Sequence, residues 1–390
     1  MSTIIRICPA PSLVGFGTLA NLPAELEARG FKRILIITDP GIAASGILQR
    51  VLDLLKGQFE LELFAEAPAE PHSVDVDRQR DRFPSHFDVL LGLGGGSSMD
   101  FAKALGIIMT HGGSLGEYVG EGTVPGPVIP VVCVPTTSGT GSQSTQTAVF
   151  TFGGVKSGCS SEYIRPVFSI VDPELTLGLS PEQTRNSGYD ALIHAVDSFL
   201  ARPHMQVPDR PILYQGSNFF SRGVALEAFR SIWGSYRQAV AHGNNREARW
   251  GMSAGSHLAG IAFSHSGLGL VHALASSLGG IIDAPHGVCL AAGTNIGLSY
   301  NLKACTHDLA ILGAITEGKE GSPQVSAERF LANLQTLIND LGLPSRPSQL
   351  GIKQEDARTL LEKTLIQTRR IKTNPRTLDN DLLSFIEKGI

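Results

Sequence analysis

The sequence predicts an α/β region followed by an all-helical region, and three observations lead to this fold class. Short runs rich in β-branched residues alternate with helical patterns through the first half of the 390-residue chain. One of these runs, residues 128–134, is apolar at nearly every position, which is typical of a strand that is covered on both faces. From about residue 180 onward, long helical patterns dominate. We therefore predict a doubly wound, mostly parallel sheet and then a helical domain.

The expected elements follow in chain order. Strands are expected at residues 33–38, 61–64, 87–93 and 128–134, and a helix at residues 48–55. Long helices are expected at residues 224–243, 247–264, 326–341 and 355–367. The chain exceeds the usual size of a single core, so two domains are expected. We place them at residues 1–180 and 181–390, with the boundary near the Ser180–Pro181 step.

Four residues of the helical half form a candidate metal site. Asp190 and His194 are four positions apart in an apolar run, so both project from one face of an expected buried helix. His272 lies in a second apolar stretch, and His286 follows on an expected loop. A carboxylate and imidazoles that face a dry interior suit Fe²⁺ or Zn²⁺, with one position open for a substrate oxygen. The alternative is three unrelated core histidines, but their shared setting in Gly-flanked apolar segments favours the metal.

Two glycine-rich segments follow expected strands. The first, residues 92–100, leads into a helix, where backbone N–H groups and the helix N-terminus favour a phosphate. The second, residues 135–142, offers hydroxyl groups that either cap helices or bind phosphate and ribose oxygens. Asp39 ends the first strong strand, where a carboxylate can accept a ribose hydroxyl. Each has a structural alternative, because a glycine triplet is also a tight turn and Asp before Pro-Gly also forms turns.

Composition excludes several classes of partner. The 32 Lys and Arg residues against 36 Asp and Glu give a net charge of −4, which provides no electrostatic case for binding nucleic acid or an anionic membrane. No apolar run has the length of a membrane span, and the first residues lack a signal-peptide pattern. The five cysteines are scattered and without CxxC spacing, so we expect them to be reduced. A cytoplasmic protein is expected.

Together, these segments resemble the iron-containing (group III) alcohol dehydrogenase family along nearly the whole chain. The matching segments, in the family's order, are residues 94–97 with Asp100, 135–142, 171–175, 190–194, 267–272, 285–287 and 373–376. The resemblance implies a dehydroquinate synthase-like fold, in which the metal lies between a dinucleotide-binding α/β domain and a helical domain. A homodimer is also expected.

The resemblance assigns roles residue by residue. The implied metal ligands are Asp190, His194, His272 and His286, and the implied cofactor-binding residues are Asp39, Gly95, Gly96, Ser97, Asp100, Thr136, Thr137 and Lys156. The implied cofactor is NAD rather than NADP, since the carboxylate of Asp39 would repel a 2′-phosphate. The implied metal is Fe²⁺, with Zn²⁺ as the alternative.

Four positions depart from the family's pattern. Ser276 stands where many members have a histidine near the substrate, and Asp197 stands where a glutamate is common. Gln143 and Glu70 replace a glutamate and an asparagine. Ser276, together with His265, is the nearest candidate in sequence for a residue of the substrate pocket.

The expected function is hydride transfer between NAD(H) and a small primary alcohol or aldehyde, with a metal that lowers the pKa of the substrate oxygen. The alternatives are a polyol dehydrogenase, a maleylacetate-type reductase or a dehydroquinate-synthase-like lyase on the same scaffold, or a non-catalytic nucleotide-binding protein. The segments that flank His194, His272 and His286 contain almost no Lys or Arg. We therefore expect a small, weakly charged substrate, unlike that of the lyase.

Overall fold

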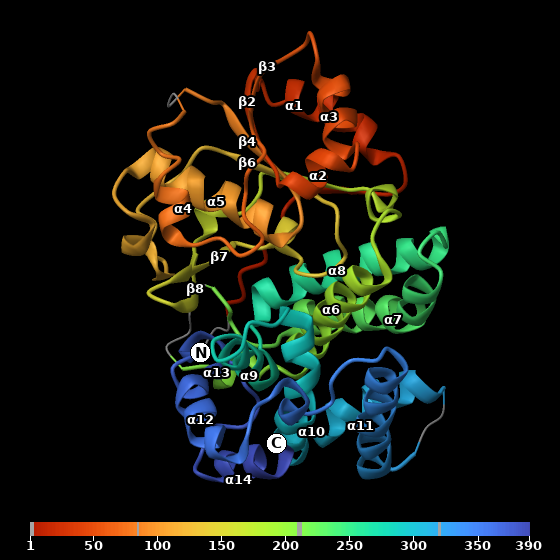
Figure 1. Ribbon diagram of the computed structural model, residues 1–390. Helices are drawn as coiled ribbons and strands as arrows, with labels where there is room; N and C mark the ends of the chain where they lie inside the picture. Colours follow the sequence, from red (N-terminus) through yellow and green to blue (C-terminus); the bar gives the residue numbers. More distant parts are fainter. Residues whose placement is uncertain (1–3, 84–85, 209–212, 319–320) are drawn as a thin grey trace.

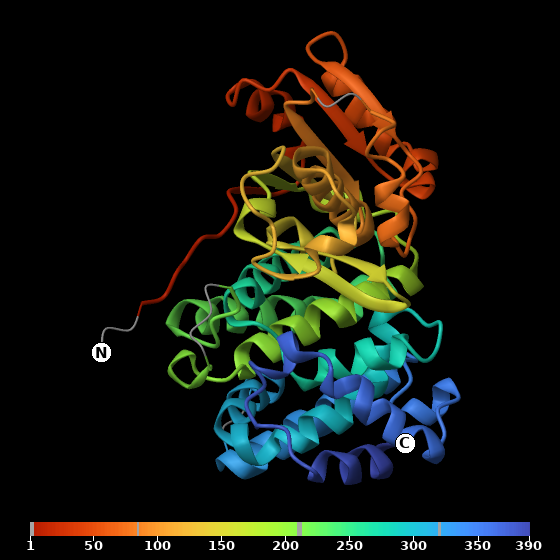
Figure 2. The ribbon, with the colours of Figure 1, turned by 90° about the vertical axis from the view of Figure 1, so that its left-hand side faces the viewer.

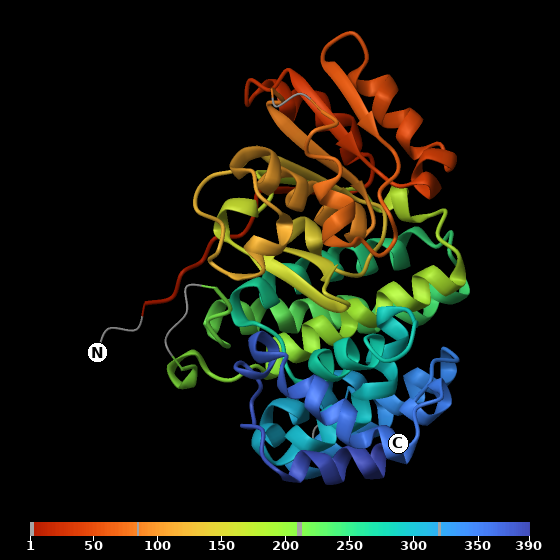
Figure 3. The ribbon, with the colours of Figure 1, turned by 60° about the vertical axis from the view of Figure 1, so that its left-hand side comes forward.

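The computed structural model describes residues 4–83, 86–208, 213–318 and 321–390. Strands and helices alternate up to β9 (Phe168–Val171), and from α6 (Pro181–Leu200) onward the named elements of the described chain are helices. Figures 1 and 3 show the sheet region above and the helices below, with the hairpin of β7 (Thr147–Phe152) and β8 (Val155–Ser160) at their junction.

A six-stranded sheet forms the framework of the α/β region. Its order is β1-β9-β6-β4-β2-β3, and all of its pairings are parallel, which confirms the predicted parallel sheet. The remaining strands of this sheet are β1 (Ser12–Val14), β2 (Arg33–Ile37), β3 (Glu60–Phe64), β4 (Val89–Gly94) and β6 (Val131–Pro135). A second, small sheet of β5 (Gly120–Glu121), β8 and β7 adds to the expected elements.

Helices cover both faces of the large sheet, as the apolar strands require. Leu35 and Ile37 of β2 belong to the apolar cluster that includes α5, whereas Ile34 and Ile36 belong to the cluster of α1 and α3. All four side chains are fully buried. The helices of this region are α1 (Leu22–Glu27), α2 (Pro40–Ala44), α3 (Ile47–Leu55), α4 (Ser73–Asp77) and α5 (Gly96–His111).

The helical region contains more helices than the sequence patterns predict. Its helices after α6 are α7 (Phe219–Ala241), α8 (Arg246–Ser266), α9 (Leu270–Gly279), α10 (His286–Glu317), α11 (Pro323–Asp340), α12 (Ala357–Leu365), α13 (Thr368–Ile371) and α14 (Asp381–Gly389). The expectation that His286 lies on a loop is wrong, because it is the first residue of α10. Small and apolar residues occupy all faces of the first half of α10, so the sequence shows no one-sided apolar period that would reveal this helix.

An N-terminal arm joins the two regions. It leaves the sheet and runs beside the helices (Figure 2), where the backbone of Arg6 exchanges two hydrogen bonds with the side chain of Gln215. In the described parts of the chain, no single helix is long and apolar enough to cross a membrane. Helices α8 and α9 meet that test only when they are counted together, across a bend of 103°.

Candidate functional site

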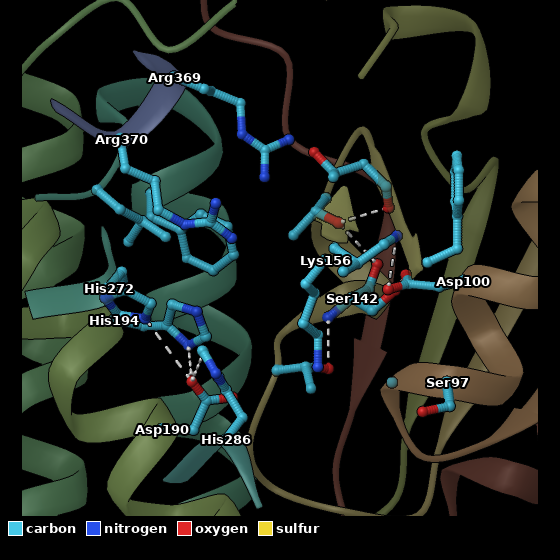
Figure 4. Close-up of a pocket in the computed structure, with 18 of the residues that line it drawn as sticks. Ser97, Asp100, Ser142, Lys156, Asp190, His194, His272, His286, Arg369 and Arg370 are labelled. Atoms are coloured by element: carbon cyan, nitrogen blue, oxygen red, sulfur yellow. Dashed lines mark hydrogen bonds and ion pairs between the residues drawn. The ribbon is translucent and has the colours of Figure 1, made fainter. Parts of the chain in front are cut away.

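A cavity of about 210 Å³ lies where the sheet region meets the helices. The helical wall carries the four candidate metal ligands, and Figure 4 shows their side chains gathered on one side of the cavity. The opposite wall comes from the start of α5, from the loop after β6 and from strand β8. Its lining residues include Gly96, Ser97, Asp100, Ser142 and Lys156. Residues from two regions that are distant in sequence therefore line one cavity.

Three helices position the candidate metal ligands. Asp190 and His194 lie one turn apart on α6, and the Oδ1 atom of Asp190 is 3.5 Å from the Nδ1 atom of His194. The same oxygen lies 3.7 Å from Nε2 of His272 on α9 and 3.8 Å from Nε2 of His286 on α10. Asp190, His272 and His286 each offer a ligand atom within 4.8 Å of the others. His194 lies beside this group, with its ring stacked on that of His272 at 4.5 Å between centroids.

These residues fit a divalent metal ion. Two ligand atoms that bind one tetrahedral ion at about 2.1 Å lie about 3.4 Å apart, close to the separations observed here. The Oδ1 atom of Asp190, Nδ1 of His194 and Nε2 of His272 are buried, and they have no hydrogen-bond partner among the described residues. Buried polar atoms are nearly always satisfied, so three such atoms in one cluster are suited to bind an ion or a ligand.

Asp197 orients one of the histidines. Its Oδ2 atom accepts a hydrogen bond from Nδ1 of His272 at 2.8 Å and another from the backbone N–H of Gly269 at 3.0 Å. The proton on Nδ1 leaves the Nε2 lone pair of His272 pointing towards Asp190. A carboxylate behind a histidine ligand is a common arrangement around metals, because it fixes the tautomer and increases the basicity of the ring.

The electrostatics of the cluster also suit a cation. Burial lowers the pKa of His194 to about 4 and holds the pKa of His286 well below its ordinary value. Burial alone would raise the pKa of Asp190, but the surrounding histidines outweigh it and leave that pKa below the ordinary range. For His272, the carboxylates of Asp190 and Asp197 outweigh burial and raise its pKa. The ionised carboxylate of Asp190 and the neutral imidazoles of His194 and His286 have the free lone pairs that metal binding requires.

A groove next to the cavity has the features of a nucleotide site. Gly95 caps α5 directly after β4, so the free N–H groups of this 16-residue helix face the groove. A side chain at Gly96 would place its Cβ 2.5 Å from Cγ2 of Thr140, so only glycine fits there. Thr136 and Thr137 line the same groove, as does the backbone around Ser97, whose hydroxyl donates to the carbonyl of Ala69.

Two candidate cofactor residues already have protein partners. Asp39 lines the groove, caps α2 by accepting from the N–H of Ile42 at 3.0 Å, and accepts from the hydroxyl of Ser98 at 3.0 Å. Lys156 lies on β8 at the rim of the cavity and pairs with Glu70 at 3.0 Å. Glu70, where the family commonly has asparagine, is thus the ionic partner of the lysine.

Asp100 belongs to a buried network on the sheet wall. Its carboxylate accepts from the hydroxyl of Ser142 at 2.5 Å and from the N–H of Val149 at 3.1 Å. The ammonium group of Lys103, which is fully buried, lies 3.6 Å from Asp100 and donates to Ser142 and Thr145. Burial raises the pKa of Asp100, although Lys103 opposes that shift. This network fixes the loop after β6 against α5.

The structure does not bring the two suggested substrate-pocket residues to the cavity. The ring of His265 accepts from the N–H of Cys8 at 3.0 Å and donates to the carbonyl of Ile261 at 2.7 Å, in a separate hollow beneath the N-terminal arm. Ser276 is buried in α9, and its hydroxyl has no partner among the described residues. It follows His272 by one turn but does not line the cavity.

Two arginines that the sequence analysis missed do line the cavity. Arg369 and Arg370 lie on α13, and Figure 4 shows Arg370 beside the histidine cluster and Arg369 farther from it, reaching towards the opposite wall. The expectation of a weakly charged substrate rested only on residues near the histidines in sequence, and it did not take these two arginines into account. The one available signal was the adjacent pair of arginines shortly before residues 373–376.

Comparisons with known proteins agree with this geometry. A family model described as iron-containing alcohol dehydrogenase matches residues 9–173, and the C-terminal model of the Fe-containing alcohol dehydrogenase family matches residues 184–388. The NAD-dependent methanol dehydrogenase of Bacillus methanolicus is 33% identical over 98% of both chains. The sulfoacetaldehyde reductase of Bilophila wadsworthia is 32% identical over 96% of this chain and 95% of its own. A crystal structure of a 1,3-propanediol oxidoreductase superposes with a TM-score of 0.91 at 30% identity, and covers 100% of both chains.

Proposed function

Because the chain belongs to the iron-containing alcohol dehydrogenase family, we propose that it interconverts a primary alcohol and an aldehyde with NAD(H) at a divalent metal ion. The observation that carries this proposal is a cluster of buried ligand atoms that have no hydrogen-bond partner among the described residues. The cluster faces a cavity beside the groove proposed for the nucleotide. In the direction of reduction, an aldehyde, NADH and one proton give the alcohol and NAD⁺.

Asp190, His194, His272 and His286 are the proposed ligands of the ion. When bound, the ion supplies a Lewis acid for the substrate oxygen, and NADH supplies the hydride. Asp197 holds the ring of His272 so that its free nitrogen faces Asp190. Fe²⁺ is the proposed metal, and Zn²⁺ has the same preference for nitrogen and carboxylate ligands.

The groove residues provide the proposed cofactor site. The N–H groups at Gly95, Gly96 and Ser97 would bind the pyrophosphate, and Asp100 would hold the loop beside it through its bond to Ser142. Thr136, Thr137 and Lys156 complete the proposed contacts.

The carboxylate of Asp39 supports NAD over NADP, since a 2′-phosphate would lie against its negative charge. Asp39 keeps its bonds to Ile42 and Ser98 in this role, because a carboxylate can accept several hydrogen bonds.

The division at residue 180, a cytoplasmic location and a homodimer remain predictions. The five cysteines are free, which supports a reducing compartment. Light scattering of the purified protein measures the number of subunits.

Metal analysis together with a cofactor assay tests the proposed function. The purified protein should contain close to one ion per chain, reduce short aldehydes with NADH, lose activity with a chelator and regain it with Fe²⁺ or Zn²⁺. Asp190→Asn is the matched variant, because it keeps the shape of the side chain and removes the charge. Full activity in metal-free protein would overturn the proposal.

A further inference from the structure

The helical wall of the cavity carries two positive charges without an acidic partner. Arg369 and Arg370 both line the cavity, and no carboxylate of the described residues lies within 4.0 Å of either guanidinium group. Together with Lys156 they also line an outer hollow, so they lie between that hollow and the cavity of the histidine cluster.

The nearby amines differ from the arginines because each already has a counter-ion. Lys156 pairs with Glu70 at 3.0 Å, and Lys372 pairs with Glu121 at 2.7 Å. The unneutralised charge of this wall therefore belongs to the arginine pair.

Neutral groups hold the two guanidinium groups in place. Arg369 donates to the hydroxyl of Ser160 at 2.9 Å and lies 5.5 Å from the ring centroid of Tyr214. Arg370 donates to the side-chain carbonyl of Gln367 at 2.6 Å, while its buried Nε has no partner among the described residues. Each guanidinium has five N–H donors, so most of them remain available to a ligand.

An unpaired buried cation is costly in free energy unless a ligand offsets its charge. Burial, followed by the neighbouring charge of Arg369, lowers the pKa of Arg370 to about 9. An anion placed between the two guanidinium groups would remove both penalties through charge-assisted hydrogen bonds.

The cofactor does not provide this anion at its phosphate-binding turn. The groove lined by Asp39, Gly95 and Thr137 contains neither arginine. In Figure 4, Ser97 marks the turn at the far side of the cavity from Arg370, which lies beside the histidines, and from Arg369, which lies at the top of the view. The arginines thus face the space left for the substrate.

We propose that Arg369 and Arg370 bind the far end of the substrate, which is a short aldehyde with a tetrahedral dianionic group such as a phosphonate or phosphate monoester. This inference rests on the proposed function, because the carbonyl end must reach the histidine cluster. Two unneutralised guanidinium groups match a charge near −2, which a phosphoryl group approaches at neutral pH and a sulfonate or carboxylate does not. The anionic group is unchanged in the reaction.

A series of aldehydes that differ only at this end tests the proposal. Phosphonoacetaldehyde, sulfoacetaldehyde and 3,3-dimethylbutanal place a dianion, a monoanion and an uncharged tetrahedral group on the same carbon skeleton. With metal-loaded enzyme and NADH, we expect kcat/KM to fall in that order, by about 100-fold or more from first to last. Glycolaldehyde phosphate and succinate semialdehyde test the ester and carboxylate alternatives. Preference for a monoanion would overturn the dianionic assignment.

Variants assign the effect to the arginines. Arg369→Met and Arg370→Met should each raise KM for phosphonoacetaldehyde by about 10- to 100-fold, with little change for 3,3-dimethylbutanal. Arg370→Lys should recover only part of the loss, because an ammonium lacks the planar fork. Arg358→Met, at an exposed position on α12, is the matched control and should leave KM unchanged for every aldehyde of the series.

A binding measurement separates this inference from the proposed function. Calorimetry should detect methylphosphonate binding to the metal-loaded protein, and both Met variants should weaken it. If the enzyme reduces uncharged and anionic aldehydes equally, and the variants change nothing, the anion site is wrong while the dehydrogenase function stands. If no aldehyde is reduced but methylphosphonate still binds through the arginines, the function is wrong and the anion site stands.

Discussion

The two walls of the cavity differ in whether their buried polar groups have hydrogen-bond partners within the protein. On the sheet wall, the buried charges of Asp100 and Lys103 meet each other and several hydroxyl and carbonyl groups. On the helical wall, Asp190, His194 and His272 leave buried ligand atoms without a hydrogen bond among the described residues. The polar groups of the sheet wall are satisfied by the protein alone, and we call this the complete wall. The polar groups of the helical wall need a ligand to be satisfied, and we call this the incomplete wall. Burial of polar residues therefore indicates a functional site only when their hydrogen bonds have been accounted for.

The largest expected effect comes from the incomplete wall. His272→Ala removes a ligand that Asp197 holds in place, so we expect loss of most of the bound metal and a fall in turnover of more than about 100-fold. The protein should remain folded, because His272 already lines the cavity and its removal enlarges that space. Metal content, turnover and circular dichroism measure these results. Full metal and full turnover in purified His272→Ala would mean that the site is misassigned.

The complete wall should respond in stability rather than in metal content. Lys103→Met leaves the carboxylate of Asp100 buried without its cation, which should cost about 3–5 kcal/mol of the free energy of unfolding. Urea denaturation measures this loss. The double variant with Asp100→Asn removes both charges and should recover part of it. Unchanged stability in Lys103→Met, together with lost metal, would reverse the contrast between the two walls.

Asp197 sharpens the comparison, because it is a satisfied carboxylate that supports the incomplete wall. Asp197→Asn should weaken metal affinity by about 10- to 100-fold, since it removes the charge that favours the Nδ1–H tautomer of His272. Titration against a chelator measures the affinity. At saturating metal, KM for the aldehyde should change by a smaller factor than the metal affinity does. The metal affinity of Asp197→Glu should be closer to that of the original protein. If Asp197→Asn bound the metal as tightly as the original protein, the role of Asp197 would be only to accept the backbone N–H groups at the start of α9.

The smallest expected effect concerns Asp39. Asp39→Asn and Asp39→Gly should both lower the ratio of kcat/KM for NAD to kcat/KM for NADP by about 10-fold. Each substitution removes the charge that repels a 2′-phosphate. Only Asp39→Gly should also lose stability, because asparagine can still cap α2. Ratios of kcat/KM for the two cofactors give the result. Equal use of NAD and NADP by the original protein would remove Asp39 from this role.

Local patterns in the sequence predict the parallel sheet and part of the site. The spacing of Asp190 and His194 on a helix is a local property, and so are the short apolar, β-branched runs that form the strands. Arg369 and Arg370 were missed because they reach the cavity only through the packing of α13 against α9. His265 was misleading for the same reason, since a position near His272 in sequence does not determine which hollow a side chain enters.

Other parts of the site depend on partners that no sequence pattern identifies. Asp197 was visible only as a departure from the family's glutamate, whereas its bond to His272 joins residues that are 75 positions apart. The pairing of Lys156 with Glu70 likewise depends on the position of β8 beside the loop after β3.

The register of α6 has a consequence for how this site can vary. Asp190, His194 and Asp197 stand at positions i, i+4 and i+7, so one helical face supplies two proposed ligands and the support for a third. Inserting or deleting one residue between them would rotate the following side chains by about 100° about the helix axis. A substitution at another position of this segment would keep the register, whereas a change in its length would separate the proposed ligands from the support of His272. Insertions that lengthen the protein should therefore accumulate in its loops and not in α6.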